Sequence, residues 1–135
     1  MRHKVLIVDD EQEIRQFLDL VLRGKGYDVV TAAGGRDGLD RARAEKPDLL
    51  LLDLMMPEID GWAVLKQLKE DGETSRIPVA ILSARSEPWD LARALQEGAV
   101  DYIAKPFSLQ DLLGRVEVIL RLAGADAAEL AGDEA

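Results

Sequence analysis

The 135-residue sequence contains no cysteine and only one histidine, His3. The lack of cysteine excludes disulfides, thiolate metal ligands and cysteine nucleophiles, and a single histidine leaves almost no scope for imidazole chemistry. No apolar run approaches the roughly 18 residues that a membrane-spanning helix needs, and Asp9 and Asp10 directly follow the first apolar run, unlike the pattern of a signal peptide. We therefore expect a cytoplasmic protein without membrane association, whose chemistry uses oxygen and nitrogen groups.

Basic residues are also few. The chain has 17 Lys and Arg against 26 Asp and Glu, for a formal net charge of -9. This balance is opposite to that of a nucleic-acid-binding surface, and nothing after Leu122 could form a helix-turn-helix. We therefore expect no direct contact with nucleic acid.

Length and composition predict one folded domain with a short tail. Hydrophobic residues make up 47% and charged residues 32% of the 135 residues, which is typical of a globular chain with a single core. After Leu122 the sequence consists of alanine, glycine and acidic residues and loses its apolar face. We predict a domain over residues 1–122, and a frayed helix end or the start of a linker over residues 123–135.

Short apolar runs alternate with longer segments of helical periodicity, which predicts stacked β-α units. The predicted strands are residues 5–8, 29–31, 49–52, 79–82 and 100–104. A helix follows each strand: the first closes at Gly24, the second covers residues 38–45, the third follows Gly61, the fourth runs from near Pro88 to Gly98, and the fifth follows a capping box at Ser108 and Asp111. Connections of this length require parallel strands. The predicted fold class is therefore α/β, a doubly wound five-stranded parallel sheet with helices on both faces.

A few polar residues directly follow the apolar runs, where a doubly wound sheet places its ligand site. They are Asp9, Asp10, Asp53, Ser83 and Lys105. Three carboxylates at one edge of a sheet repel one another, and a hard divalent cation such as Mg²⁺ relieves the conflict. A lysine can pair with an anion, a serine hydroxyl can bind a phosphoryl oxygen, and an aspartate can act as a nucleophile that forms an acyl phosphate.

Each of these residues has an ordinary structural interpretation when it is taken singly. Asp10 could cap the first helix, and Asp53 could be a turn residue before Pro57. Ser83 could be a loop hydroxyl, and Lys105 a solvated surface lysine. Their common position at the ends of predicted parallel strands favours a functional site.

Four segments resemble the motifs of the receiver domain of two-component response regulators, in the same order and with the same spacing. They are VLIVDDE at residues 5–11, LLLLDLMMPEIDGW at residues 49–62, ILSA at residues 81–84 and DYIAKPF at residues 101–107. The resemblance covers residues 4–122. It implies a flavodoxin-like fold with strand order 2-1-3-4-5, and a cis peptide bond between Lys105 and Pro106.

The resemblance also implies a role for each site residue. Asp53 is expected to accept a phosphoryl group from a sensor histidine kinase or a phosphotransfer protein. Asp10, Asp53 and the backbone carbonyl of Met55 are expected to hold Mg²⁺, with Asp9 acting through a coordinated water. Ser83 and Lys105 are expected to contact the phosphoryl oxygens. Such a domain catalyses its own phosphorylation and dephosphorylation without being a conventional enzyme.

In the family, phosphorylation draws Ser83 toward the phosphoryl group and turns the aromatic ring at Tyr102 inward. The expected result is a changed face formed by the fourth helix, fifth strand and fifth helix, which controls a partner, a C-terminal output domain or a phosphorylation-dependent homodimer. Met55 and Arg85 flank the site and are expected to modulate the lifetime of the phosphoryl group. Trp89 could anchor a partner on that face or belong to the core, and Trp62 is expected to pack near the site. Family members more often have threonine at the position of Ser83.

Other functions stay open at this point. A receiver could act as a docking module that is independent of phosphorylation, and an aspartyl-phosphate phosphohydrolase would use similar carboxylates. The chain has no obvious cap or substrate pocket of a hydrolase. A flavodoxin-type mononucleotide carrier needs a phosphate-binding loop after the first strand, where Asp9, Asp10 and Glu11 would repel a phosphate.

Overall fold

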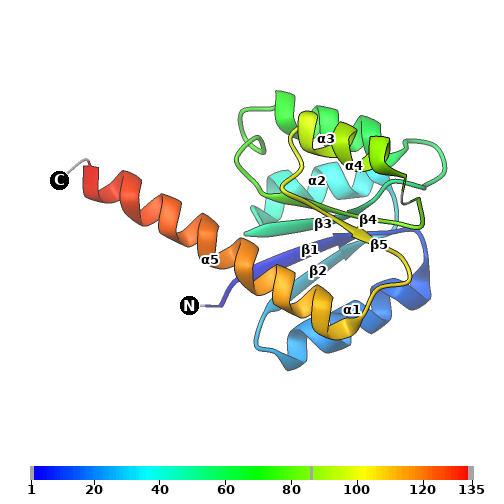
Figure 1. The fold of residues 1–135 in the computed structure, drawn as a ribbon, viewed down its shortest axis with the longest axis horizontal. Coiled ribbons are helices and arrows are strands. Elements are labelled where there is room, and N and C mark those ends of the chain that lie inside the picture. The colour runs from blue at the N-terminus through cyan, green and yellow to red at the C-terminus, as the bar shows by residue number, and fades with distance from the viewer. Residues whose placement is uncertain (1, 86, 134–135) are drawn as a thin grey trace.

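The computed structural model describes residues 2–85 and 87–133, with side chains described up to residue 124. Its strands form one sheet in the order β2-β1-β3-β4-β5, and all neighbouring strands are parallel (Figure 1). The strands are β1 (Lys4–Val8), β2 (Asp28–Ala32), β3 (Leu49–Asp53), β4 (Val79–Ser83) and β5 (Asp101–Ala104). The predicted fold class and strand order are confirmed.

Helices cover both faces of the sheet (Figure 1). They are α1 (Gln12–Gly24), α2 (Gly35–Glu45), α3 (Gly61–Glu70), α4 (Pro88–Gln96) and α5 (Leu109–Asp133). Helices α1 and α5 lie on one face, and α2, α3 and α4 lie on the other. In the part of the chain that the structure describes, no helix is long and apolar enough to cross a bilayer.

The central strands have no exposed face, which explains their uninterrupted apolar runs. Side chains alternate between the two cores: Leu50 and Leu52 of β3 pack toward α2 and α3, whereas Leu49 and Leu51 pack toward α1 and α5. All four are fully buried. Polar side chains can therefore occur only at the ends of these strands. In β3 and β4 they lie at the carboxyl ends, at Asp53 and Ser83.

One detail of the helix ends differs from the sequence prediction, and another agrees with it. Helix α1 has Glu11, not Asp10, at its N-cap position, and no side chain caps it. The alternative that Asp10 caps this helix is therefore wrong. The carboxylate beside the helix start that accepts a backbone N–H is that of Asp9, which binds the Glu11 N–H at 2.9 Å. The cap predicted at Ser108 is present, since its Oγ accepts the N–H of Asp111 at 3.2 Å.

Helix α5 continues past the predicted domain boundary. It runs without interruption from Leu109 to Asp133 and projects beyond the sheet (Figure 1). The change in composition after Leu122 thus does not end the helix. The division into residues 1–122 and 123–135 stays a proposal based on composition.

Candidate functional site

Three carboxylates meet at the carboxyl edge of the sheet. Asp9 and Asp10 follow β1, and Asp53 is the last residue of β3, the strand beside it. Each offers an oxygen atom, and these atoms lie within 4.8 Å of one another. Asp9 and Asp53 are buried, whereas Asp10 is exposed. The sequence prediction correctly brought these three residues together.

Close packing of helix α3 against the end of β3 shapes the loop beside Asp53. The N–H of Gly61 donates to the carbonyl of Leu54 at 3.0 Å. A Cβ atom on Gly61 would lie 2.4 Å from the carbonyl oxygen of Asp53, so no larger residue fits without a shift of the backbone. Asp60 then caps α3 by accepting the N–H of Ala63 at 2.9 Å. Together these contacts hold the segment that carries Met55.

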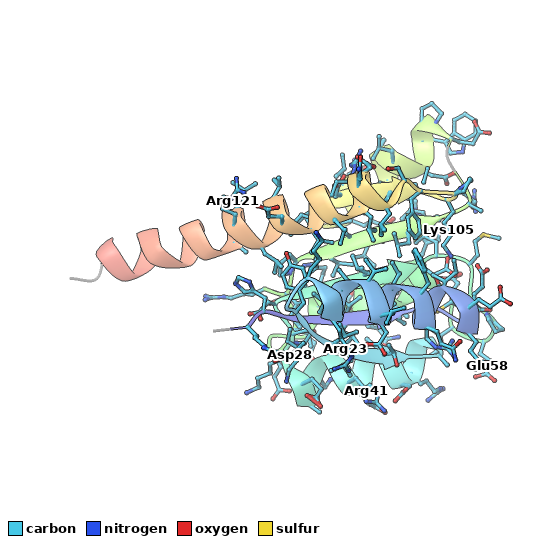
Figure 2. All side chains as sticks on the ribbon, turned by 90° about the horizontal axis from the view of Figure 1, so that it is seen from below. Arg23, Asp28, Arg41, Glu58, Lys105 and Arg121 are labelled. Atoms are coloured by element: carbon cyan, nitrogen blue, oxygen red, sulfur yellow. The ribbon has the colours of Figure 1, made fainter. Side chains whose placement is uncertain are left out.

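Lys105 supplies the positive charge of the site. Its Nζ lies 2.9 Å from Oδ2 of Asp9, 3.1 Å from Oε1 of Glu11 and 3.7 Å from Oδ2 of Asp53. The residue follows β5, and its backbone N–H donates to the carbonyl of Ser83. Figure 2 shows Lys105 at the end of the molecule where the strands terminate, with Glu58 of the β3–α3 loop at the same end. The expected cis bond between Lys105 and Pro106 is present.

The electrostatics of the cluster raise the pKa of Asp53 to about 6. Burial is the main cause, and the charges of Asp9 and Asp10 add to it, while the Met55 N–H at 3.1 Å and the Lys105 charge oppose it. Burial lowers the pKa of Lys105, but hydrogen bonds and charges from Asp9, Asp53 and Glu11 outweigh it, so the pKa lies above its usual value. The cluster thus holds more negative charge than Lys105 balances.

The donor set fits a hard divalent cation. Three carboxylates offer oxygen ligands within a small volume, and the charges of Asp9 and Asp10 add to burial in raising the pKa of Asp53. Both oxygens of Asp9 are already engaged, since Oδ1 accepts the Glu11 N–H and Oδ2 accepts Lys105. Asp10 and Asp53 are therefore better placed than Asp9 to ligate an ion directly.

Ser83 and Tyr102 lie on the strands beyond Asp53. Ser83 ends β4 and is fully buried, and its Oγ accepts the N–H of Arg85 at 3.1 Å. Tyr102 of β5 is also buried, and its hydroxyl donates to the backbone carbonyl of Arg85. Burial raises the pKa of Tyr102, and the Ser83 hydroxyl acts in the opposite direction. The ring of Tyr102 is thus already directed inward in this structure, which is the position that the resemblance assigns to the phosphorylated state.

A hollow of about 380 Å³ adjoins the site. Its lining residues come from the β3–α3 loop, helix α3 and the β4–α4 loop: Leu54, Met55, Met56, Asp60, Trp62 and Arg85. Met55 and Arg85 thus face one hollow, as the prediction that both flank the site requires. The guanidinium of Arg93 stacks 4.0 Å from the centre of the Trp62 ring.

The sequence prediction missed two residues of this region. Glu11 stands in the first motif without a predicted role, yet its carboxylate accepts a hydrogen bond from Lys105. Asp90 is buried on the inner side of α4 and pairs with Arg85 at 3.1 Å. A signal for Asp90 existed, since it stands one helical turn before the buried Ala94. Trp89 is 64% exposed, so the alternative that it belongs to the core is wrong.

Comparison with known proteins agrees with this geometry. Residues 5–117 match the family model of the response regulator receiver domain. The chain is 42% identical over 136 residues to the alkaline phosphatase synthesis transcriptional regulatory protein PhoP of Bacillus subtilis, covering 99% of this chain and 56% of that protein. It is 42% identical over 118 residues to the response regulator ArlR of Staphylococcus aureus, covering 87% of this chain and 52% of that protein. The chain thus spans about half the length of the curated relatives it matches.

Solved structures give the same result. The chemotaxis protein CheY4 of Vibrio cholerae superimposes with a TM-score of 0.83 at 30% identity, over 88% of this chain and 99% of that one. The receiver domain of the Francisella response regulator 1452 gives a TM-score of 0.83 at 33% identity, over 89% of this chain and 98% of that one. With sheet order, acidic cluster and family model in agreement, the chain belongs to the family of response regulator receiver domains.

Proposed function

We propose that this chain accepts a phosphoryl group on Asp53, in a Mg²⁺-dependent reaction, from the phosphohistidine of a sensor histidine kinase or a phosphotransfer protein. One observation carries the proposal. The buried carboxylate of Asp53 ends a central strand with Asp9 and Asp10 within 4.8 Å and the Lys105 ammonium at 3.7 Å. Family membership supports the same chemistry.

The nucleophile is one carboxylate oxygen of Asp53. It attacks the phosphorus atom, an O–P bond forms as the N–P bond breaks, and the electron pair of that bond returns to the histidine nitrogen. The pKa of Asp53 is about 6, so the carboxylate is ionised and can react when the pH is above this value. The Met55 N–H holds Oδ1 at 3.1 Å, so Oδ2, which faces Lys105, is the freer oxygen.

The remaining residues stabilise the transferred group. Lys105 offers a positive charge that can leave Asp9 and Glu11 for the phosphoryl oxygens, and Ser83 offers a hydroxyl from the neighbouring strand. Asp10, Asp53 and the Met55 carbonyl would hold Mg²⁺, with Asp9 acting through water. When bound, Mg²⁺ offsets the charge of the phosphoryl oxygens. The same residues serve the later hydrolysis.

The output is a change of the face formed by α4, β5 and α5. Phosphorylation adds roughly -1.5 to -2 charge next to Ser83, which favours a second packing of the β4–α4 loop against the inward ring of Tyr102. This face carries exposed apolar side chains at Trp89, Leu91, Leu95, Val100, Val118 and Leu122. They suit contact with a partner, an output domain or a second phosphorylated copy.

Intact mass spectrometry tests the proposal. The chain is incubated with phosphoramidate in the presence and absence of Mg²⁺, and Asp53→Asn is treated in parallel. We expect a gain of one phosphoryl group that requires both Mg²⁺ and Asp53, and a matched surface variant, Asp40→Asn, should behave as wild type. No gain in a folded protein would instead favour the docking module, and sustained turnover of small phosphate esters would favour a phosphohydrolase.

A further inference from the structure

Arg85 makes three contacts that join the site around Asp53 to helix α4. Its backbone N–H donates to Oγ of Ser83 at 3.1 Å, and its backbone carbonyl accepts from the hydroxyl of Tyr102. Its guanidinium lies 3.1 Å from Oδ1 of Asp90, in the first turn of α4. One loop residue therefore contacts the serine and tyrosine of the expected switch and also the helix of the output face.

Asp90 is an unusual residue for the inner side of a helix. Its side chain is only 4% exposed, and its Oδ2 has no hydrogen-bond partner among residues 2–85 and 87–133. A buried carboxylate is costly unless an opposite charge compensates it. Within the described part of the chain that charge comes from Arg85, whose side chain is 48% exposed. Burial thus holds the Asp90 carboxylate in place, and the ion pair in turn holds the more exposed Arg85 guanidinium.

We propose that Asp90 is a positioning residue: its ion pair with Arg85 ties the β4–α4 loop to helix α4, so that a movement of Ser83 is transmitted to this helix. The inference rests on the proposed function, because the movement in question is the response to a phosphoryl group on Asp53. Asp90 is thereby added to the residues of the switch, although in the proposed function it contacts neither the phosphoryl group nor Mg²⁺.

The hydrogen bonds explain the direction of this coupling. Ser83 Oγ accepts the Arg85 N–H, so the backbone at Arg85 must follow when the hydroxyl turns toward a phosphoryl oxygen, or the bond is lost. If the Arg85 side chain had no ion-pair partner, it would move in the solvent with its backbone and transmit nothing to α4. Because Asp90 holds the guanidinium, the displacement acts on the first turn of α4 instead. Coupling requires an element that both sites bias, and the β4–α4 loop meets this condition.

The experiment uses two reporters, one in α4 and one at the phosphoryl site. Trp89 adjoins Asp90 in α4 and is exposed, so its indole N–H resonance reports on the helix. The backbone N–H of Met55 donates to Oδ1 of Asp53, so its resonance reports on the phosphoryl site. The experiment records ¹H–¹⁵N spectra of the full chain before and after treatment with phosphoramidate and Mg²⁺. Intact mass counts the phosphoryl groups in the same samples.

In the wild type we expect both the Trp89 indole resonance and the Met55 amide resonance to shift. Asp90→Asn should keep the mass gain and the Met55 shift, while the Trp89 shift falls by about threefold or more. Arg85→Gln should reduce the Trp89 shift to the same extent for each phosphoryl group that mass spectrometry counts, the double variant should lose nothing further, and Arg85→Lys should retain the response because the pair can still form. Glu87→Gln removes a charge from the same end of α4, where Glu87 is exposed and makes no side-chain cap, and should respond as wild type.

The inference is overturned if Asp90→Asn is phosphorylated to the same extent and keeps the full Trp89 shift. If this variant does not fold, Arg85→Gln tests the same pair from its exposed side, and a full Trp89 shift there overturns the inference equally. A wild-type chain that gains no phosphoryl mass overturns the proposed function and this inference with it. If Asp90→Asn and Arg85→Gln take up a phosphoryl group and keep the full Trp89 shift, the inference is refuted while the proposed function stands.

Discussion

The Nζ of Lys105 lies 2.9 Å from Oδ2 of Asp9, a residue 96 positions earlier in the chain. This ion pair joins the end of β5 to the end of β1 across the carboxyl edge of the sheet. It also leaves Lys105 within 3.7 Å of Asp53, so a single cation is shared by the carboxylates that crowd the site. The charge balance of this cluster leads to the first three predictions.

Removal of Lys105 should destabilise the metal-free protein. In Lys105→Met the buried carboxylates of Asp9 and Asp53 lose their compensating charge, and we expect a loss of about 1–3 kcal/mol in the free energy of unfolding. Mg²⁺ should restore part of the loss because it supplies the missing positive charge. Urea unfolding with EDTA and with Mg²⁺ measures both effects. Lys66→Met, at an exposed helix position, is the matched control, and equal stability of the two variants would contradict the shared-cation interpretation.

Neutralising Asp53 should stabilise the metal-free protein, with a defined pH dependence. Its pKa rises from 3.8 to about 6 on folding, so the folded state binds the proton more tightly than the unfolded chain. Stability from this group is therefore present below about pH 4 and is lost as pH rises through about 6. Asp53→Asn should gain at most about 3 kcal/mol at pH 7.5 and almost nothing at pH 4. Thermal melts in EDTA at both pH values test the prediction, and a gain independent of pH would refute it.

Mg²⁺ should raise the melting temperature in a way that depends on Asp10. An ion that binds only the folded state stabilises it by about 1.4 kcal/mol for each tenfold increase above the dissociation constant. Asp10 is exposed and has an oxygen within 4.8 Å of those of Asp9 and Asp53, so Asp10→Asn should weaken the response without unfolding the protein. Asp37→Asn, on the surface of α2, should leave it unchanged. An identical Mg²⁺ response in Asp10→Asn would show that the ion binds elsewhere.

Replacement of Gly61 by alanine should destabilise the protein, whereas the same replacement at Gly72 should be tolerated. The added Cβ atom at Gly61 would meet the backbone of Asp53 at 2.4 Å, but at Gly72 no atom lies within 4 Å. We expect Gly61→Ala to cost about 2–4 kcal/mol through a shift of the β3–α3 loop, and Gly72→Ala to change stability by less than about 0.5 kcal/mol. Denaturant unfolding of the two variants compares them directly, and equal midpoints would contradict the close approach.

The sequence allowed the sheet and the central cluster to be predicted because both follow from short-range patterns. Strands buried on both faces read as uninterrupted apolar runs, and parallel strands place the residues that follow them at one edge. Asp53, Ser83 and Lys105 were found in this way. Helix α2, by contrast, begins at Gly35, before the predicted start at residue 38, because the Gly34 to Gly38 segment carries little apolar signal.

Contacts between side chains of different elements could not be predicted in the same way. The pair of Arg85 with Asp90 depends on how the β4–α4 loop turns before α4, which no spacing rule specifies. The same holds for Glu11, which reaches Lys105 across the sheet edge. At Asp10, the alternative of a helix cap is wrong because the choice between adjacent carboxylates depends on loop geometry, which places Asp9 on the Glu11 N–H.

The central claim is that Asp53 is the residue that carries the phosphoryl group. The chain is phosphorylated with phosphoramidate and Mg²⁺ and reduced with borohydride, which converts an aspartyl phosphate to homoserine, and the peptides are sequenced by tandem mass spectrometry. We predict homoserine at position 53, dependent on Mg²⁺ and absent from Asp53→Asn. Homoserine at position 9 or 10 instead, or at no position in a folded protein that binds Mg²⁺, would contradict the account.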